Sequence, residues 1–96
     1  MDETAKMRFE TKALHVGQEP EPTTGAVVTP IYQVSTFRLP TPDETDEYVY
    51  ARVSNPTTVA LEQVVAALEG GRQALAFGSG MAATTTAMSL AHAGEH

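Results

Sequence analysis

The strongest hydrophobic pattern in the chain lies in its second half. Four aliphatic residues recur there at the i, i+3, i+4, i+7 spacing of one helix face: Leu61, Val64, Val65 and Leu68. Asn55 is a good helix cap, and Pro56 after it fits the first turn of a helix. Gly70 and Gly71 follow the last aliphatic residue and favour termination. We therefore predict a helix between Asn55 and Gly70.

A second unit follows this helix. The short apolar run 73–77 is bounded by glycines and predicts a buried strand. Small residues from about Met81 to Ala93 predict another helix, which Gly94 would end. The order helix, strand, helix favours an α/β fold with a parallel sheet. Such a sheet needs more strands than this chain supplies, so we expect an incomplete fold that stops where a further strand would begin.

The first half of the chain has a different character. Five of the six prolines fall between residues 11 and 42, and proline is unfavourable in helix interiors and central strands. The same region contains β-branched and aromatic residues in 27–28 and 31–37, which favour burial. We predict an extended N-terminal arm over 1–54 that lies on the rest of the polypeptide or on a neighbouring subunit, and the beginning of a larger domain over 55–96.

Composition narrows the class of protein. The 96 residues suffice for one small domain, and three Phe, three Tyr and no Trp make a large independent core doubtful. A net charge of −6 disfavours binding to nucleic acid or anionic lipid. The chain has no cysteine, no apolar signal segment and no stretch that could span a membrane. We expect a cytoplasmic protein.

The turn between the predicted strand and the second helix is the best candidate for chemistry. It contains Gly78, Ser79 and Gly80 directly before the helix. Glycines permit a close backbone approach, and the free amides of a helix start favour an anion such as phosphate. A plain glycine-containing turn is an equal alternative. The spacing Gly78-x-Gly80-x-x-Ala83 also fits the dinucleotide pattern, which would make this the start of an NAD(P)-dependent oxidoreductase.

A second candidate lies at the end of the arm. In an extended segment Tyr48, Tyr50 and Arg52 would share one side, where a phenol and a guanidinium could bind the same anion. The alternative is a strand edge with a solvated arginine. The three histidines have no spacing typical of a metal site, and no serine has an evident base partner for nucleophilic catalysis.

These segments together resemble the pyridoxal-phosphate (PLP) family of cystathionine γ-synthase, cystathionine γ-lyase, methionine γ-lyase and O-acetylhomoserine sulfhydrylase. The resemblance covers nearly the whole chain and rests on several ordered motifs: Thr11-Lys12-Ala13-Leu14-His15-Val16-Gly17, Thr24-Gly25-Ala26-Val27-Val28-Thr29-Pro30-Ile31-Tyr32, Ser35-Thr36-Phe37, Tyr48-x-Tyr50-x-Arg52, Asn55-Pro56-Thr57 with Leu61-Glu62, Leu68-Glu69-Gly70-Gly71 and Ser79-Gly80-Met81. The stretch 17–32 is most similar to cystathionine γ-synthase and γ-lyase.

The resemblance implies a fold, a cofactor and an activity. The fold is the start of a type I, aspartate-aminotransferase-like large domain preceded by the arm. The amides of Gly80 and Met81 would hold the cofactor phosphate, and Tyr50 and Arg52 would reach it from a neighbouring subunit of a dimer or a dimer of dimers. The parent enzyme would catalyse elimination or γ-replacement on sulfur amino acids or homoserine esters.

The resemblance also implies that part of the site is missing from this chain. The family's cofactor-binding lysine, the aspartate at the pyridine nitrogen, the aromatic residue over the ring and the arginine for the substrate carboxylate all match positions after residue 96. We therefore expect the 96 residues alone to be inactive. A non-catalytic module that docks on a full-length relative is a further alternative.

Overall fold

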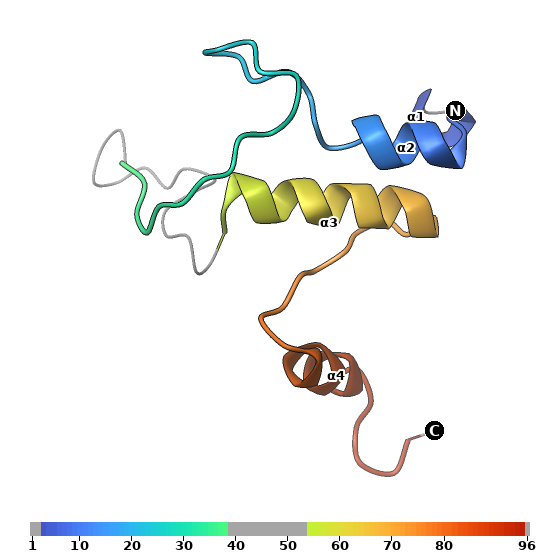
Figure 1. The fold of residues 1–96 in the computed structure, drawn as a ribbon. Helices are drawn as coiled ribbons and strands as arrows, with labels where there is room; N and C mark the ends of the chain where they lie inside the picture. Colours follow the sequence, from blue (N-terminus) through green and yellow to red (C-terminus); the bar gives the residue numbers. More distant parts are fainter. Residues whose placement is uncertain (1–2, 39–53, 96) are drawn as a thin grey trace.

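The computed structural model describes residues 3–38 and 54–95. Four helices lie in these two ranges. They are α1 (Glu3–Lys6), α2 (Phe9–His15), α3 (Pro56–Glu69) and α4 (Gly80–Met88). Helices α2 and α3 lie side by side, whereas α4 is separated from α3 by an extended segment (Figure 1).

Helix α3 confirms the prediction for 55–70. The side chain of Asn55 accepts a hydrogen bond from the backbone N–H of Thr57 at 2.8 Å, which caps the helix start. Pro56 occupies the first turn, where its missing N–H costs nothing. Gly70 ends the helix in the left-handed conformation, with φ of 67°, and its N–H donates to the carbonyl of Ala66. Both ends are thus determined by local sequence.

The N-terminal region differs in part from the predicted extended arm. Residues 9–15 form helix α2, because no proline interrupts the sequence before residue 20. Beyond α2, residues 18–38 contain no helix or strand. The carboxylate of Glu21 organises a turn there, accepting hydrogen bonds from the hydroxyl and N–H of Thr24 and the N–H of Thr23. These bonds hold the pKa of Glu21 below its ordinary value.

The predicted strand over 73–77 is absent from the structure, and no strand is found in residues 3–38 or 54–95. The segment is extended, but a strand also needs a neighbouring backbone to satisfy its N–H and C=O groups. For one backbone group of this segment a side chain replaces the neighbouring backbone, since the N–H of Ala76 donates to the carboxylate of Glu62. The apolar pattern of 73–77 predicted the extended conformation, but it could not show whether a neighbouring strand is present.

The last helix is shorter than predicted. It ends at Met88 instead of Ala93. The hydroxyl of Ser89 donates to the carbonyl of Thr86 at 2.6 Å, and that carbonyl is the one to which Leu90 would bond in a continuing α-helix. The N–H of Leu90 bonds to Ala87 instead, in the tighter i to i−3 pattern. Side-chain competition for the backbone therefore accounts for the early end.

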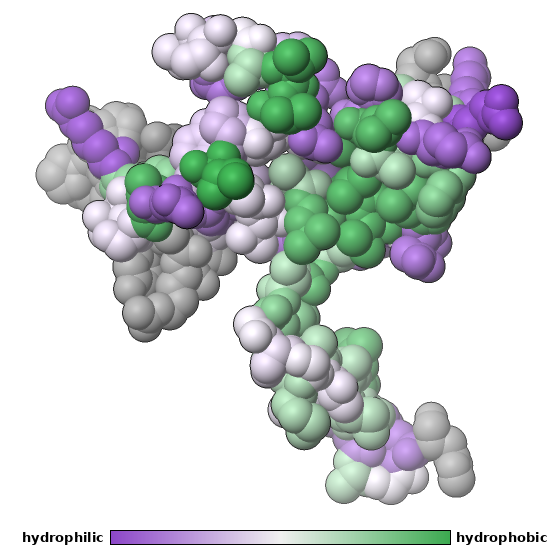
Figure 2. Space-filling model, viewed as in Figure 1, coloured by the Kyte–Doolittle hydropathy of each residue, from purple (hydrophilic) through white to green (hydrophobic). Residues whose placement is uncertain are grey.

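The described residues contain no buried hydrophobic side chain. The chain exposes 8032 Å², whereas a compact protein of its mass exposes about 5,300 Å². Its radius of gyration is 16.4 Å, against about 12.5 Å for a compact domain of this length. Figure 2 shows apolar residues on the surface over α3 and along the segment that leads to α4. These surfaces are of the kind that other protein normally covers.

In the described ranges every helix falls short of the length and apolarity that a membrane span requires.

Gly17 fixes how α2 leads toward α3. Its φ is +77°, and a Cβ built on it would lie 2.9 Å from Cβ of Gln63 and 3.0 Å from the carbonyl oxygen of Ala60. Gly25 has a similar φ of +75° with nothing within 4 Å of such a Cβ. Only Gly17 therefore combines a left-handed backbone with close packing in this comparison.

We expect Gly17→Ala to destabilise the full-length protein more than Gly25→Ala. Both substitutions cost about 1 kcal/mol for the left-handed backbone, and Gly17→Ala adds a clash with α3. Urea unfolding of the two variants beside wild type measures the difference. Equal losses for the two variants would contradict the packing role of Gly17.

Candidate functional site

The turn that precedes α4 is built by local hydrogen bonds. Ser79 is extended, with φ of −155°, and its hydroxyl oxygen accepts from the N–H of Ala82 at 3.1 Å. The first backbone bond of the helix runs from the N–H of Ala83 to the carbonyl of Ser79. The sequence prediction of a helix that starts at this turn is therefore confirmed, with the helix beginning at Gly80.

Two backbone donors remain at the start of α4. The N–H groups of Gly80 and Met81 precede the first helical bond, and neither has a hydrogen-bond partner in the described part of the chain. Gly78 and Gly80 are exposed, and a Cβ built on either meets nothing within 4 Å. Two free donors, the positive end of the helix dipole and open space together suit an anion.

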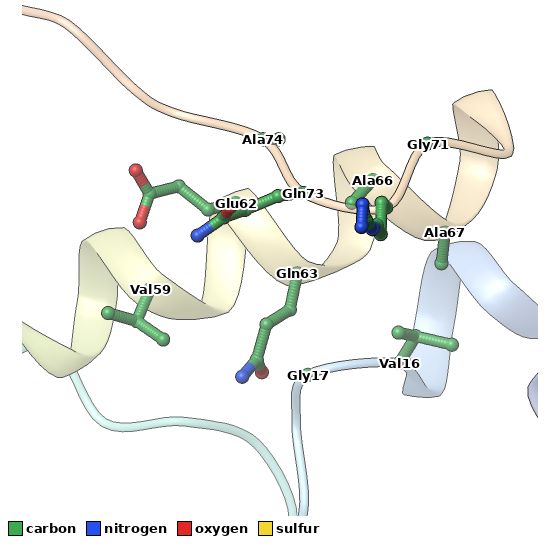
Figure 3. A pocket seen from close by; sticks show the side chains of 11 residues that line it. Val16, Gly17, Val59, Glu62, Gln63, Ala66, Ala67, Gly71, Gln73 and Ala74 are labelled. Atoms are coloured by element: carbon green, nitrogen blue, oxygen red, sulfur yellow. The ribbon is translucent and has the colours of Figure 1, made fainter.

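The extended segment before the turn is connected to α3 through Glu62. The carboxylate of Glu62 accepts a hydrogen bond from the N–H of Ala76 at 2.7 Å, across 14 positions of sequence. In Figure 3 the Glu62 side chain leaves α3 in the direction of the extended segment, while Gln63 points toward Gly17. A cavity of about 520 Å³ lies between these elements, lined by Val16 and Gly17, by one face of α3 and by residues 71–74.

A polar cluster at the start of α3 holds the arm. Asn55, 7% exposed, donates from Nδ2 to the carbonyl of Tyr32 at 2.9 Å. The hydroxyl of Thr57 accepts from the N–H of Tyr32 at 2.8 Å and reaches the carbonyl of Pro30 at 3.4 Å. Both backbone groups of Tyr32 are therefore paired. The capping role of Asn55 was predicted, but its bond to the arm and the role of Thr57 were not.

The sequence-predicted site residues divide into two pairs. Gly80 and Met81 lie next to each other at the start of α4. Tyr50 and Arg52 lie outside the described residues, so their convergence on the same anion stays a prediction. The bond of Glu62 to the extended segment was not predicted. The signal in the sequence was a carboxylate directly after Leu61 in a helix whose neighbouring positions are mostly apolar.

The comparisons with known proteins identify the family. Residues 10–96 match the family described as Cys/Met metabolism PLP-dependent enzyme. The chain belongs to this family, whose cofactor is pyridoxal phosphate. The resemblance found in the sequence motifs is confirmed.

Relatives with different activities match the chain about equally. It is 47% identical over 91 residues to a cystathionine beta-lyase of Coxiella burnetii, covering 95% of this chain and 24% of the relative. It is 48% identical over 88 residues to a probable cystathionine gamma-synthase of Herpetosiphon aurantiacus, covering 92% and 28%. The crystal structure of cystathionine gamma-lyase from Lactobacillus plantarum complexed with L-serine matches with a TM-score of 0.80 at 46% identity, covering 94% and 23%.

The chain spans about a quarter of the length of the curated relatives that it matches. The described helices therefore correspond to one part of a larger enzyme fold. Similar identities to a beta-lyase, a gamma-synthase and a gamma-lyase mean that these residues do not distinguish the three activities.

The free donors at Gly80 and Met81 fit the phosphate of PLP. Phosphate is a multiply charged acceptor that matches two adjacent N–H groups at a helix start. The open space at Gly80 leaves room for it. The residues present are thus compatible with the cofactor that defines the family.

We expect Thr57→Val to release Tyr32 from α3. The substitution keeps the shape of the side chain but removes the hydroxyl that accepts from the N–H of Tyr32. Amide exchange at Tyr32 should become faster, and unfolding free energy should fall by about 1 kcal/mol. Thr58→Val, at the exposed neighbouring position, is the matched control. Unchanged exchange at Tyr32 in Thr57→Val would contradict the role of the Thr57 hydroxyl in holding Tyr32 to α3.

Proposed function

We propose that the full-length protein is a PLP-dependent enzyme that catalyses elimination or γ-replacement on sulfur amino acids or homoserine esters. Family membership supports the cofactor and the amino-acid substrate class. The names of the relatives support cystathionine as the type of substrate. Because the identities to lyases and to a synthase are nearly equal, the proposal includes both activities.

The observation that carries the proposal is the pair of N–H groups at Gly80 and Met81, which have no hydrogen-bond partner within residues 3–38 and 54–95. In a PLP enzyme the phosphate anchors the cofactor, and a helix N-terminus is an effective anchor for phosphate. The Ser79 cap contributes by bonding the N–H of Ala82, which leaves the two preceding amides as the accessible donors. Their position in an exposed turn allows a ligand to approach.

The residues of this chain have binding and orienting roles in the proposed mechanism. When bound, PLP stabilises negative charge on the substrate carbon next to the amino group. The amides of Gly80 and Met81 hold its phosphate, and Tyr50 and Arg52 of the partner subunit add a hydroxyl and a forked positive donor. Fixing the phosphate from both sides orients the cofactor ring relative to the substrate.

This arrangement requires at least a dimer, and we propose a dimer of dimers for the full-length enzyme. The exposed apolar residues of the arm support it, since Val27 and Ile31 are 81% and 75% exposed. We further propose that 1–54 is a subunit-contacting arm, that 55–96 begins a type I aminotransferase-like large domain, and that the protein is cytoplasmic. The 96 residues alone would lack the covalent anchor of the cofactor and be inactive.

Hydrogen exchange on the full-length protein tests the cofactor site. We expect PLP to slow exchange of the amides of Gly80 and Met81, because they become donors to phosphate, and NAD(P) to leave them unchanged. Protection by NAD(P) but not by PLP would favour the dinucleotide reading of Gly78 to Ala83 and contradict the proposal.

A substitution at Arg52 tests the contribution of the second subunit. Arg52→Ala should weaken PLP retention by about 1.5 to 3 kcal/mol, the range for a lost charge-assisted hydrogen bond. The measurement is the dissociation constant of PLP by fluorescence titration of the apoenzyme. Arg72→Ala is the control, because Arg72 follows α3 and has no proposed contact with the cofactor. PLP affinity at the wild-type level in Arg52→Ala would show that the role assigned to Arg52 is wrong.

A further inference from the structure

Residues 72–77 connect two junctions that contain glycine. The chain leaves α3 through Gly70 and Gly71 and enters the turn before α4 through Gly78. The N–H groups of Gly70 and Gly71 both donate to the carbonyl of Ala66 and hold the first junction to the end of α3. Gly78 constrains the second junction little, because glycine has the greatest backbone freedom of any residue. A contact made by the segment itself therefore adds to the placement of the turn relative to α3.

Glu62 provides such a contact. Its carboxylate accepts from the N–H of Ala76 at 2.7 Å, a short, charge-assisted hydrogen bond. Glu62 is half-buried on α3, whereas Leu75, Ala76 and Phe77 are exposed. The segment is thus fixed by a polar bond in a region where apolar packing contributes little.

The bond also acts close to the proposed phosphate site. Ala76 is four residues before Gly80 and three before the capping Ser79. Extended backbone advances about 3.3 Å per residue, so the restrained amide lies within about 10 Å along the chain from the cap. Holding Ala76 leaves only residues 77 and 78 between the restrained amide and the cap, which limits the positions that the amides of Gly80 and Met81 can take relative to α3.

We infer that Glu62 is a positioning residue for the cofactor phosphate: it acts through the N–H of Ala76 to orient the turn that presents Gly80 and Met81. This inference rests on the proposed function of that turn. Glu62 does not touch the cofactor in this arrangement, and its negative charge is directed to the backbone of the segment.

The role predicts a specific pattern among substitutions. Glu62→Ala removes the acceptor and should free the segment. Glu62→Gln retains a side-chain oxygen that can accept from the N–H of Ala76, so it should recover most of the loss. Glu69→Ala is the matched control. Glu69 is an exposed glutamate at the end of the same helix, and its carboxylate has no hydrogen bond to the described residues.

The test compares PLP with pyridoxal, which has the same ring without the phosphate. The dissociation constants of both are measured on the full-length apoenzyme for wild type and the three variants. We expect Glu62→Ala to weaken PLP binding about tenfold, as for one lost charge-assisted hydrogen bond, with little change for pyridoxal. General damage to the fold would weaken both ligands alike and would overturn the inference.

Amide exchange at Ala76 supplies a readout that needs no cofactor. It should be faster in Glu62→Ala than in wild type, Glu62→Gln or Glu69→Ala, and equal rates would overturn the inference. Affinities of the wild-type protein distinguish the phosphate site from the role of Glu62. Equal affinity of wild type for PLP and pyridoxal would contradict the proposed phosphate site itself, whereas a phosphate preference that survives Glu62→Ala would contradict only the role of Glu62.

Discussion

Hydrogen bonds from a few side chains to backbone groups hold the described part of this chain together. In ordinary domains burial of apolar surface dominates stability, but residues 3–38 and 54–95 bury no hydrophobic side chain. Asn55, Glu62 and Ser79 instead bond to backbone amides or carbonyls at the start of α3, along the extended segment and at the start of α4. The arrangement of the site depends on these polar contacts.

Helix α3 is the rigid element that links them. The arm is bonded to its first turn through Asn55 and Thr57, and the extended segment is bonded to Glu62. Glu62 follows Asn55 by seven positions, which is about 10 Å of helix. The arm and the segment that leads to the turn before α4 are thereby both held to α3. The capping residues Asn55 and Gly70 matter because they define where α3 begins and ends.

The sequence was most informative where structure is decided locally. The cap at Asn55 and the stop at Gly70 follow from residue types and were predicted, and the start of the last helix was predicted at about Met81, one residue from its observed start at Gly80. The strand at 73–77 was not predicted correctly, because pairing depends on a neighbouring backbone that a pattern of side chains cannot reveal. The end of α4 was missed because Ser89 competes for a carbonyl, and Glu62 was missed because its partner is a backbone amide 14 residues away. Tyr50 and Arg52 lie outside the described residues.

We propose that the start of α4 binds the phosphate of PLP, and a crystal structure of the full-length protein with PLP would show whether this contact exists. We expect phosphate oxygens within about 2.7–3.2 Å of the backbone nitrogens of both Gly80 and Met81. A PLP phosphate bound elsewhere, with these two amides free or bonded to protein, would contradict the claim.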